Sequence, residues 1–131
     1  MLVKSQVKYI QSLSQKKLRD ETQLFIAEGP KIINEFLRST PGRLHQLYAT
    51  ATWLKANDEL VRTIPGDRII AIDEKELESI STLSTPNEVV AILRQPERQR
   101  SIELKDTVTL MLDSIQDPGN LGTIIRCADW F

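Results

Sequence analysis

The sequence has one cysteine and one histidine, and aromatic residues make up only 5% of its 131 residues. A lone cysteine excludes a disulfide framework within this chain, and one cysteine with one histidine excludes a zinc site of the Cys/His type. We expect Cys127 to be a packing residue on a helix and His45 to be structural or exposed. The aromatic residues Tyr9, Tyr48 and Trp53 follow apolar stripes, so we expect them in the core and not as stacking platforms for bases.

Long apolar runs are also absent. No stretch approaches the roughly 20 residues that span a bilayer. The start, "MLVKSQVKYIQ", lacks the apolar segment and the small-residue cleavage site of a signal peptide. The balance of 40% hydrophobic and 27% charged residues is that of a soluble globular protein. These features predict a cytoplasmic protein without a membrane partner.

Charge of one sign does not dominate, because the net charge is −1, but its distribution is uneven. Residues 1–45 hold eight Lys and Arg against four Asp and Glu, a net +4 that leaves −5 for residues 46–131. This asymmetry favours a basic face near the N-terminus that could bind nucleic acid. A solvated, lysine-rich helix face would give the same pattern.

Helical and strand-like patterns alternate along the first three quarters of the chain. This alternation predicts a layered α/β domain. A polar, charged connection is expected over 14–22, helical at most at its start. Expected helices cover residues 1–12, 30–38, 53–63 and 74–84, and expected strands cover 24–29, 44–50, 68–73 and 88–94.

A polar stretch, "RQPERQRSIELKD", interrupts the alternation and predicts a domain boundary. We expect a first domain over 1–96, a linker over 97–106 and the start of a second domain over 107–131. "TVTLMLDSI" is almost continuously apolar, as in a strand buried on both faces of a parallel sheet. One such strand and one helix cannot make a domain, so we expect the rest of the second domain to be missing from this chain.

The last twenty residues, "LDSIQDPGNLGTIIRCADWF", contain a tight turn followed by an amphipathic helix. Asp117-Pro118-Gly119 is a strong turn signal, and Asn120 is placed to act as the N-cap of the helix. Neither a dinucleotide-binding fingerprint nor a phosphate-binding P-loop is present. The turn therefore predicts a site at a sheet edge without assigning its ligand.

Arg126 is the basic residue of this helix. It lies four residues after Gly122 and three after Thr123, so the three share a face. Two small side chains beside one guanidinium leave a shelf where a phosphate or a ribose could approach. The alternative is a surface arginine that pairs with Asp129 or Asp113.

This segment closely resembles the first signature motif of the SpoU family of RNA ribose 2′-O-methyltransferases, in the SPOUT superfamily. The pattern Asp-Pro-x-Asn-x-Gly-x-x-x-Arg is matched without exception at Asp117, Pro118, Asn120, Gly122 and Arg126. "KKLRDETQLFIAEGPKIINEFL" is similar to the substrate-binding domain of that family, which often shows Phe-x-x-Glu-Gly before a helix. "STPNEVVAIL" resembles the end of that domain, with Asn-Glu in place of the usual Gln-Gly.

The resemblance implies a three-layer α/β/α domain like certain RNA-binding ribosomal proteins, followed by the first strand and helix of a truncated SPOUT α/β domain. It implies an S-adenosylmethionine-dependent enzyme that methylates RNA, most commonly ribosomal RNA, and works as a homodimer. Family members bind S-adenosylmethionine in a C-terminal trefoil knot whose motifs are not in this chain. We therefore expect this polypeptide alone to be inactive, with no cofactor-binding residues of its own.

The resemblance also assigns site residues. Arg126 would grip a phosphate beside the reacting ribose and stabilise the developing alkoxide, and Asn120 would either cap the helix or hydrogen-bond the ribose. For the first domain, the basic residues that we expect to contact the RNA backbone are Lys16, Lys17 and Arg19, with Lys31 and Arg43 behind them.

Two other functions fit the same sequence. One is a stand-alone, non-catalytic RNA-binding module. The other is an interaction segment over 112–131 that packs onto a second copy, because its apolar strand would need cover.

Overall fold

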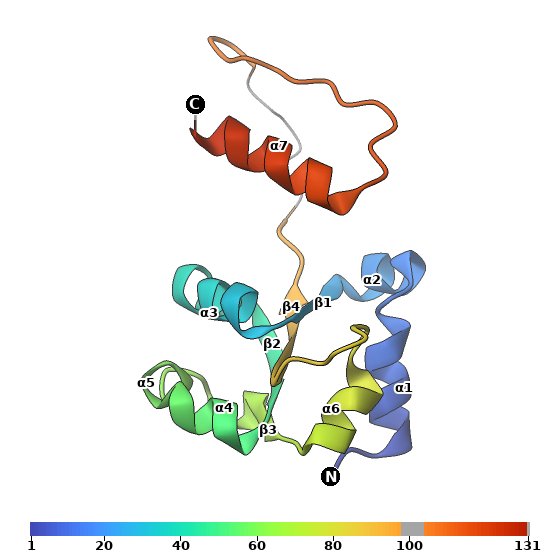
Figure 1. Cartoon of the computed structure of the whole chain (residues 1–131), viewed down its shortest axis with the longest axis vertical. Coiled ribbons are helices and arrows are strands. Elements are labelled where there is room, and N and C mark those ends of the chain that lie inside the picture. The colour runs from blue at the N-terminus through green and yellow to red at the C-terminus, as the bar shows by residue number, and fades with distance from the viewer. Residues whose placement is uncertain (98–103, 131) are drawn as a thin grey trace. The chain divides into compact units, whose positions relative to one another are not determined.

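The computed structural model describes residues 1–97 and 104–130. Residues 1–97 form one unit, built on a mixed sheet with the strand order β1-β4-β2-β3 (Figure 1). The strands are β1 (Leu24–Glu28), β2 (Leu44–Ala49), β3 (Ile69–Ala71) and β4 (Val89–Arg94). β4 is antiparallel to both of its neighbours, and β2 is parallel to β3.

β4 is buried because it is covered on both faces. Its first five residues, Val89 to Leu93, are all buried, which explains their continuous apolar sequence. Val89, Ala91 and Leu93 face one hydrophobic cluster, and Val90 and Ile92 face the other. The alternation follows from the two-residue period of a strand.

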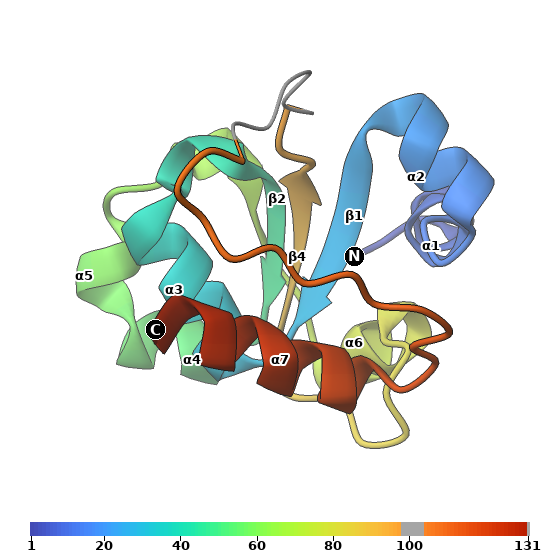
Figure 2. The ribbon, with the colours of Figure 1, turned by 90° about the horizontal axis from the view of Figure 1, so that it is seen from above.

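Helices lie on both sides of the sheet and complete three layers (Figure 2). On one side lie α3, α4 and α5, and on the other α1, α2 and α6. The three-layer α/β/α arrangement expected from the sequence is confirmed. The helices are α1 (Lys4–Ser12), α2 (Lys16–Thr22), α3 (Pro30–Ser39), α4 (Ala51–Ala56), α5 (Asp58–Val61) and α6 (Glu74–Ile80), with short 3-10 turns at Pro41–Arg43 and Gly66–Arg68.

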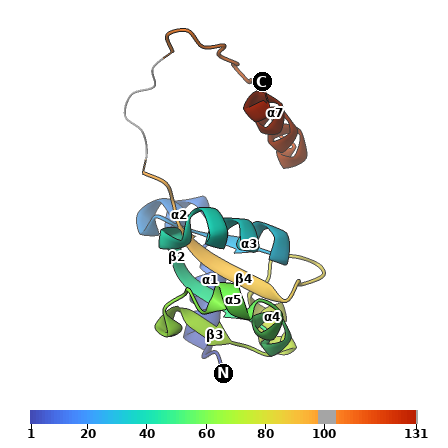
Figure 3. The same cartoon turned by 90° about the vertical axis from the view of Figure 1, so that its left-hand side faces the viewer.

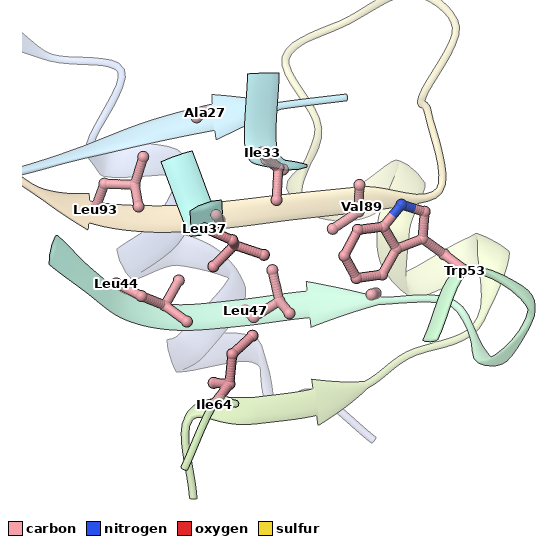
Figure 4. Packing of buried hydrophobic residues seen from close by; sticks show 11 residues of the cluster. Ala27, Ile33, Leu37, Leu44, Leu47, Trp53, Ile64, Val89 and Leu93 are labelled. Atoms are coloured by element: carbon pink, nitrogen blue, oxygen red, sulfur yellow. The ribbon is translucent and has the colours of Figure 1, made fainter. Parts of the chain in front are cut away.

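Trp53 and Ile33 pack over β4 and β2 in the larger hydrophobic cluster (Figure 4). Tyr48 belongs to the cluster on the other face of the sheet. The core positions predicted for Trp53 and Tyr48 are therefore confirmed. The same prediction for Tyr9 is wrong, because Tyr9 on α1 is 43% exposed.

Local signals explain where the helices begin. Gly29 has φ +98°, which glycine adopts without strain, and Pro30 follows as the first residue of α3. The side chain of Thr50 accepts a hydrogen bond from the backbone of Trp53 at the start of α4. Asp73 caps α6, accepting from the backbone N–H of Glu76 at 2.8 Å.

Two helix predictions need correction. The single helix expected over 53–63 is broken into α4 and α5 at Asn57, whose backbone leaves the helical range with φ −117° and ψ 29°. The Asn57 side chain also donates to the carbonyl of Trp53 at 2.9 Å, a local bond that favours the end of a helix. The connection expected over 14–22 is mostly helix, since α2 spans Lys16–Thr22. Helix α2 ends at Gln23, which adopts the left-handed conformation with φ 57°.

The carboxylate of Glu28 ties the end of β1 to the loop that follows α6. It accepts hydrogen bonds from the Ser81 hydroxyl at 2.5 Å and from the Thr82 backbone and hydroxyl at 2.9 and 2.6 Å. Next to it, the Gly29 N–H donates to the Val89 carbonyl at 3.1 Å. Glu28 and Gly29 thus position the loop from which β4 enters the sheet.

The described residues 104–130 contain one regular element, α7 (Pro118–Trp130). The strand predicted over 107–115 is not formed there, because a strand needs hydrogen-bonded partners and these residues pair with none in the described structure. Val108, Leu110 and Met111 are exposed accordingly. Cys127 is exposed as well, so its predicted packing role is wrong in this structure.

Across the described part of the chain, every helix is too short or too polar to span a bilayer.

The Glu28 contacts generate a prediction about stability. Glu28→Ala removes a charged acceptor of three hydrogen bonds, so we expect the free energy of unfolding to fall by about 1–3 kcal/mol. Glu78→Ala, which truncates an exposed glutamate on α6, should change it by less than about 0.5 kcal/mol. Urea denaturation measures both, and equal effects of the two substitutions would contradict the role given to Glu28.

Candidate functional site: the basic end of the sheet

The sheet topology brings basic residues from separate parts of the chain to one end. β1, β2 and β3 begin at this end and β4 terminates there, as the pairings of Leu24 with Arg94 and of Leu44 with Leu93 show. Figure 3 shows α2 and the tip of β4 together at this end. We call it the basic end, made by Lys16, Lys17, Arg19, Arg43, His45, Arg68 and Arg94.

The opposite end of the sheet is acidic. β1 ends at Glu28, and β3 leads into the Asp73 cap and the acidic first turn of α6, with Glu74 and Glu76. Glu88 directly precedes β4. An anionic ligand would therefore be attracted to one end of the sheet and repelled from the other.

Lys16 and Lys17 project from α2 with 77% and 85% of their side chains exposed. Each pairs with an acid one turn later, Lys16 with Asp20 at 2.5 Å and Lys17 with Glu21 at 3.9 Å. Exposed pairs of this kind contribute only about 0–1 kcal/mol, so the ammonium groups can exchange these partners for phosphate.

Arg19 has a structural role that the sequence did not suggest. Its guanidinium donates to the carbonyls of Leu13 and Ser14 at 3.2 and 2.5 Å, which satisfies the C-terminal end of α1. Its own carbonyl accepts from the Gln95 side chain at 3.2 Å. Replacing Arg19 would disturb the junction of α1, α2 and β4 as well as any RNA contact.

The other two residues predicted to contact RNA, Arg43 and Lys31, lie at different ends of the sheet. Arg43 is half-buried in the turn before β2 and belongs to the basic end. Lys31 is exposed in the first turn of α3, which starts where β1 stops, so it lies toward the acidic end. The structure thus brings Lys16, Lys17, Arg19 and Arg43 to one end of the sheet and leaves Lys31 at the other.

Three basic residues of this end, His45, Arg68 and Arg94, were not predicted as contacts. Each belongs to or flanks a different strand, and their proximity depends on the order β4-β2-β3, which the sequence pattern did not reveal. The Arg68 guanidinium donates to the Leu44 carbonyl at 3.0 Å. His45 and Arg94 line a groove of about 430 Å³ that runs from the end of α2 to Glu97.

Burial lowers the pKa of His45 below its ordinary value of 6.5, and the nearby Arg94 and Arg68 lower it further. His45 is therefore neutral at neutral pH, with one ring nitrogen able to donate and the other able to accept a hydrogen bond.

This shift predicts a pH effect on stability. As the pH falls below about 6.5, the unfolded chain binds a proton at His45 before the folded chain does, so stability is lost until the pH passes the lowered folded pKa. His45→Gln removes this contribution. We expect wild type to lose more free energy of unfolding than the variant between about pH 7.5 and about pH 5.5 in urea titrations. Parallel losses would contradict the shift.

In the segment 104–130, Asp117 caps α7. Its carboxylate accepts from the backbone N–H groups of Gly119 and Asn120 at 3.2 and 3.0 Å. Asn120 therefore lies inside the first turn and is not the N-cap, which corrects that prediction. The signal for this arrangement was Pro118, which favours the first helical position and places the cap one residue earlier.

Arg126 is exposed on α7, one turn after Gly122. In the described residues it forms no ion pair with Asp113 or Asp129, so the pairing considered as an alternative is absent there. A side chain at Gly122 would meet no atom within 4 Å, so the face beside Arg126 is open. The catalytic roles of Arg126 and Asn120 stay predictions.

Comparison with known proteins places these features in a family. The chain is 32% identical over 128 residues to the 23S rRNA (guanosine(2553)-2′-O)-methyltransferase RlmP of Bacillus subtilis, covering 94% of this chain and 46% of that protein. It is 31% identical over 121 residues to mitochondrial rRNA methyltransferase 3 of Xenopus laevis, covering 86% of this chain and 28% of that protein. The chain spans half the length or less of these relatives.

Solved structures of RNA methyltransferases also match this chain. An AdoMet-bound rRNA methyltransferase from Sinorhizobium meliloti matches with a TM-score of 0.68 and 34% identity, covering 99% of this chain and 49% of that one. An RNA 2′-O ribose methyltransferase matches with a TM-score of 0.72 and 26% identity, covering 98% of this chain and 50% of that one. Residues 4–91 match the family described as the MRM3-like substrate binding domain, and the chain belongs to that family.

Proposed function

We propose that this chain is the RNA-holding part of an S-adenosylmethionine-dependent ribose 2′-O-methyltransferase that acts on ribosomal RNA. The observation that carries the proposal is the basic end of the sheet, whose residues other than Arg94 lie within residues 4–91, the part matched as substrate-binding. Its lysine and arginine side chains suit the phosphates of RNA. The rRNA methyltransferases among the relatives support the choice of substrate.

The proposed reaction takes place at a ribose 2′-hydroxyl of the RNA, beside a phosphate that this chain would contact. The 2′-hydroxyl must lose its proton while its oxygen is held in line with the methyl carbon. Arg126 stays protonated, so its proposed role is to grip the adjacent phosphate and to stabilise the developing alkoxide. The side chain of Asn120 is proposed to hydrogen-bond the ribose, since Asp117 already caps the helix.

S-adenosylmethionine would supply the methyl group, its sulfonium–methyl bond breaking to leave a thioether as the oxygen–methyl bond forms, and the hydroxyl proton would pass to a base or to water. An enclosed donor site needs buried walls, and every described side chain of residues 104–130 is exposed or half-buried. These residues do not form such a site as they stand. Homodimerisation of the full-length protein and a cytoplasmic location remain predictions.

A stand-alone RNA-binding module is the second candidate. It is favoured by the observation that residues 1–97 form a unit with hydrophobic clusters on both faces of its own sheet. Both candidates require the basic end to bind RNA, and they differ in whether methyl transfer accompanies binding.

The shared requirement is testable with α2. Lys16→Ala/Lys17→Ala removes two exposed ammonium groups and leaves Arg19 in its structural role. We expect the affinity for a ribosomal RNA stem-loop to fall about tenfold and the slope of log K against log salt to decrease by about 1–2. Fluorescence anisotropy at several salt concentrations measures both quantities.

The matched control is Lys55→Ala/Lys75→Ala. These lysines are also exposed, and they lie on α4 and α6, which begin at the acidic end of the sheet. This control should bind as wild type does. Equal weakening by both double variants would show a non-specific charge effect, and unchanged binding by Lys16→Ala/Lys17→Ala would remove α2 from the RNA surface.

A further inference from the structure

The groove beside His45 has features that the family match and the motif do not explain. It is lined by the end of α2 and the start of β1, by His45 from β2, and by the residues that follow β4. Its volume of about 430 Å³ falls within the range of small-ligand pockets. The groove adjoins the end of α2, because Thr22, the last residue of that helix, is part of its wall.

A β-bulge sets the position of His45. Leu44 pairs with Leu93 and Gln46 pairs with Ile92, so His45 is the extra residue between two registers. Bulges turn a side chain away from the regular alternation and are common beside functional sites. Here the bulge places the imidazole at the groove.

Arg94 lines the groove together with His45, whereas Arg68 donates to the Leu44 carbonyl and does not line the groove. Arg94 ends β4 on one side of β2, and Arg68 precedes β3 on the other. Both are close enough to His45 to disfavour its charged form. The order of the strands therefore collects two permanent positive charges and one titratable group around a single strand.

The two arginines near His45 form no ion pair in the described structure, although two acids lie near them. The ion pairs found in residues 1–97 involve neither Arg94 nor Arg68. Arg94 is exposed and donates no hydrogen bond there. The acids near the two arginines are Glu97, which lines the groove, and Asp67, whose carbonyl accepts from the Gln46 side chain at 3.3 Å.

We propose that this groove binds a phosphate of the RNA backbone, held by Arg94, as a second contact beyond α2. The inference rests on the proposed function, because it assumes that RNA is the ligand of the basic end. The guanidinium fork of Arg94 matches phosphate oxygens, and the positive charge of Arg68 in the turn before β3 would add to the attraction. Neutral His45 offers a donor and an acceptor, which complement the 2′-hydroxyl of the adjacent ribose.

Arg94→Ala tests the contact without disturbing the fold, since the side chain is exposed and makes no hydrogen bond in the described structure. With a fluorescein-labelled ribosomal RNA stem-loop, we expect about five- to tenfold weaker binding and a salt slope reduced by about 1. Arg94→Glu should weaken binding further. Urea midpoints equal to wild type establish that both variants are folded.

Arg62→Ala is the matched control, because Arg62 is an exposed arginine directly after α5 and does not line the groove; it pairs with Asp58 at 2.5 Å. It should bind RNA within about twofold of wild type. If Arg94→Ala and Arg94→Glu bind like Arg62→Ala while wild type binds RNA, the phosphate contact is overturned and the proposed function stands. If wild type shows no salt-dependent binding to the RNA, both the proposed RNA-holding function and this inference are contradicted.

Discussion

The position of β4 determines the rest of the first unit. It is the last strand in the described residues, and it lies between β1 and β2 and runs antiparallel to both. Its side chains contribute to both hydrophobic clusters, so neither face of the sheet can pack without it. Glu28 and Gly29 help to fix where β4 enters the sheet, because they bind the loop after α6 and the first residue of β4 at the end of β1.

The same insertion creates the functional surface. Since β4 runs opposite to its neighbours, its final residue, Arg94, arrives where β1, β2 and β3 begin. The turn before β3 brings Arg68, and the bulge in β2 presents His45 between them. The acidic residues gather at the other end through the same topology, so a chain with a net charge of only −1 has a strongly polarised sheet.

The elements of the first unit could be predicted from the sequence because their signals are local. Alternating and helical patterns marked the strands and helices, and Gly29-Pro30 and the acidic turn after Asp73 marked helix starts. The break at Asn57 could not be predicted from periodicity, because it depends on the backbone conformation of one residue, whose side chain binds a backbone carbonyl. The apolar run over 107–115 predicted a strand, but apolar character does not supply the partner that a strand requires.

The site was predictable only in part, because some of its residues are neighbours in the sequence and others meet only in the folded sheet. Lys16, Lys17 and Arg19 are neighbours in the chain, so their clustering was visible, although the bonds from Arg19 to the end of α1 were not. The grouping of His45, Arg68 and Arg94 depends on strand order and on a bulge, which are long-range properties. Composition indicated a basic surface near the N-terminus, and the topology extended it to residues from the middle of the chain.

The most direct test of this account is to map bound RNA by NMR, following the backbone amides of the ¹⁵N-labelled chain as a ribosomal RNA stem-loop is added. The account predicts salt-sensitive shifts at the basic end, over residues 16–24, 43–46, 67–69 and 93–97. Shifts confined to the acidic end, over residues 28–31 and 73–88, would contradict it, as would a spectrum that RNA leaves unchanged at low salt.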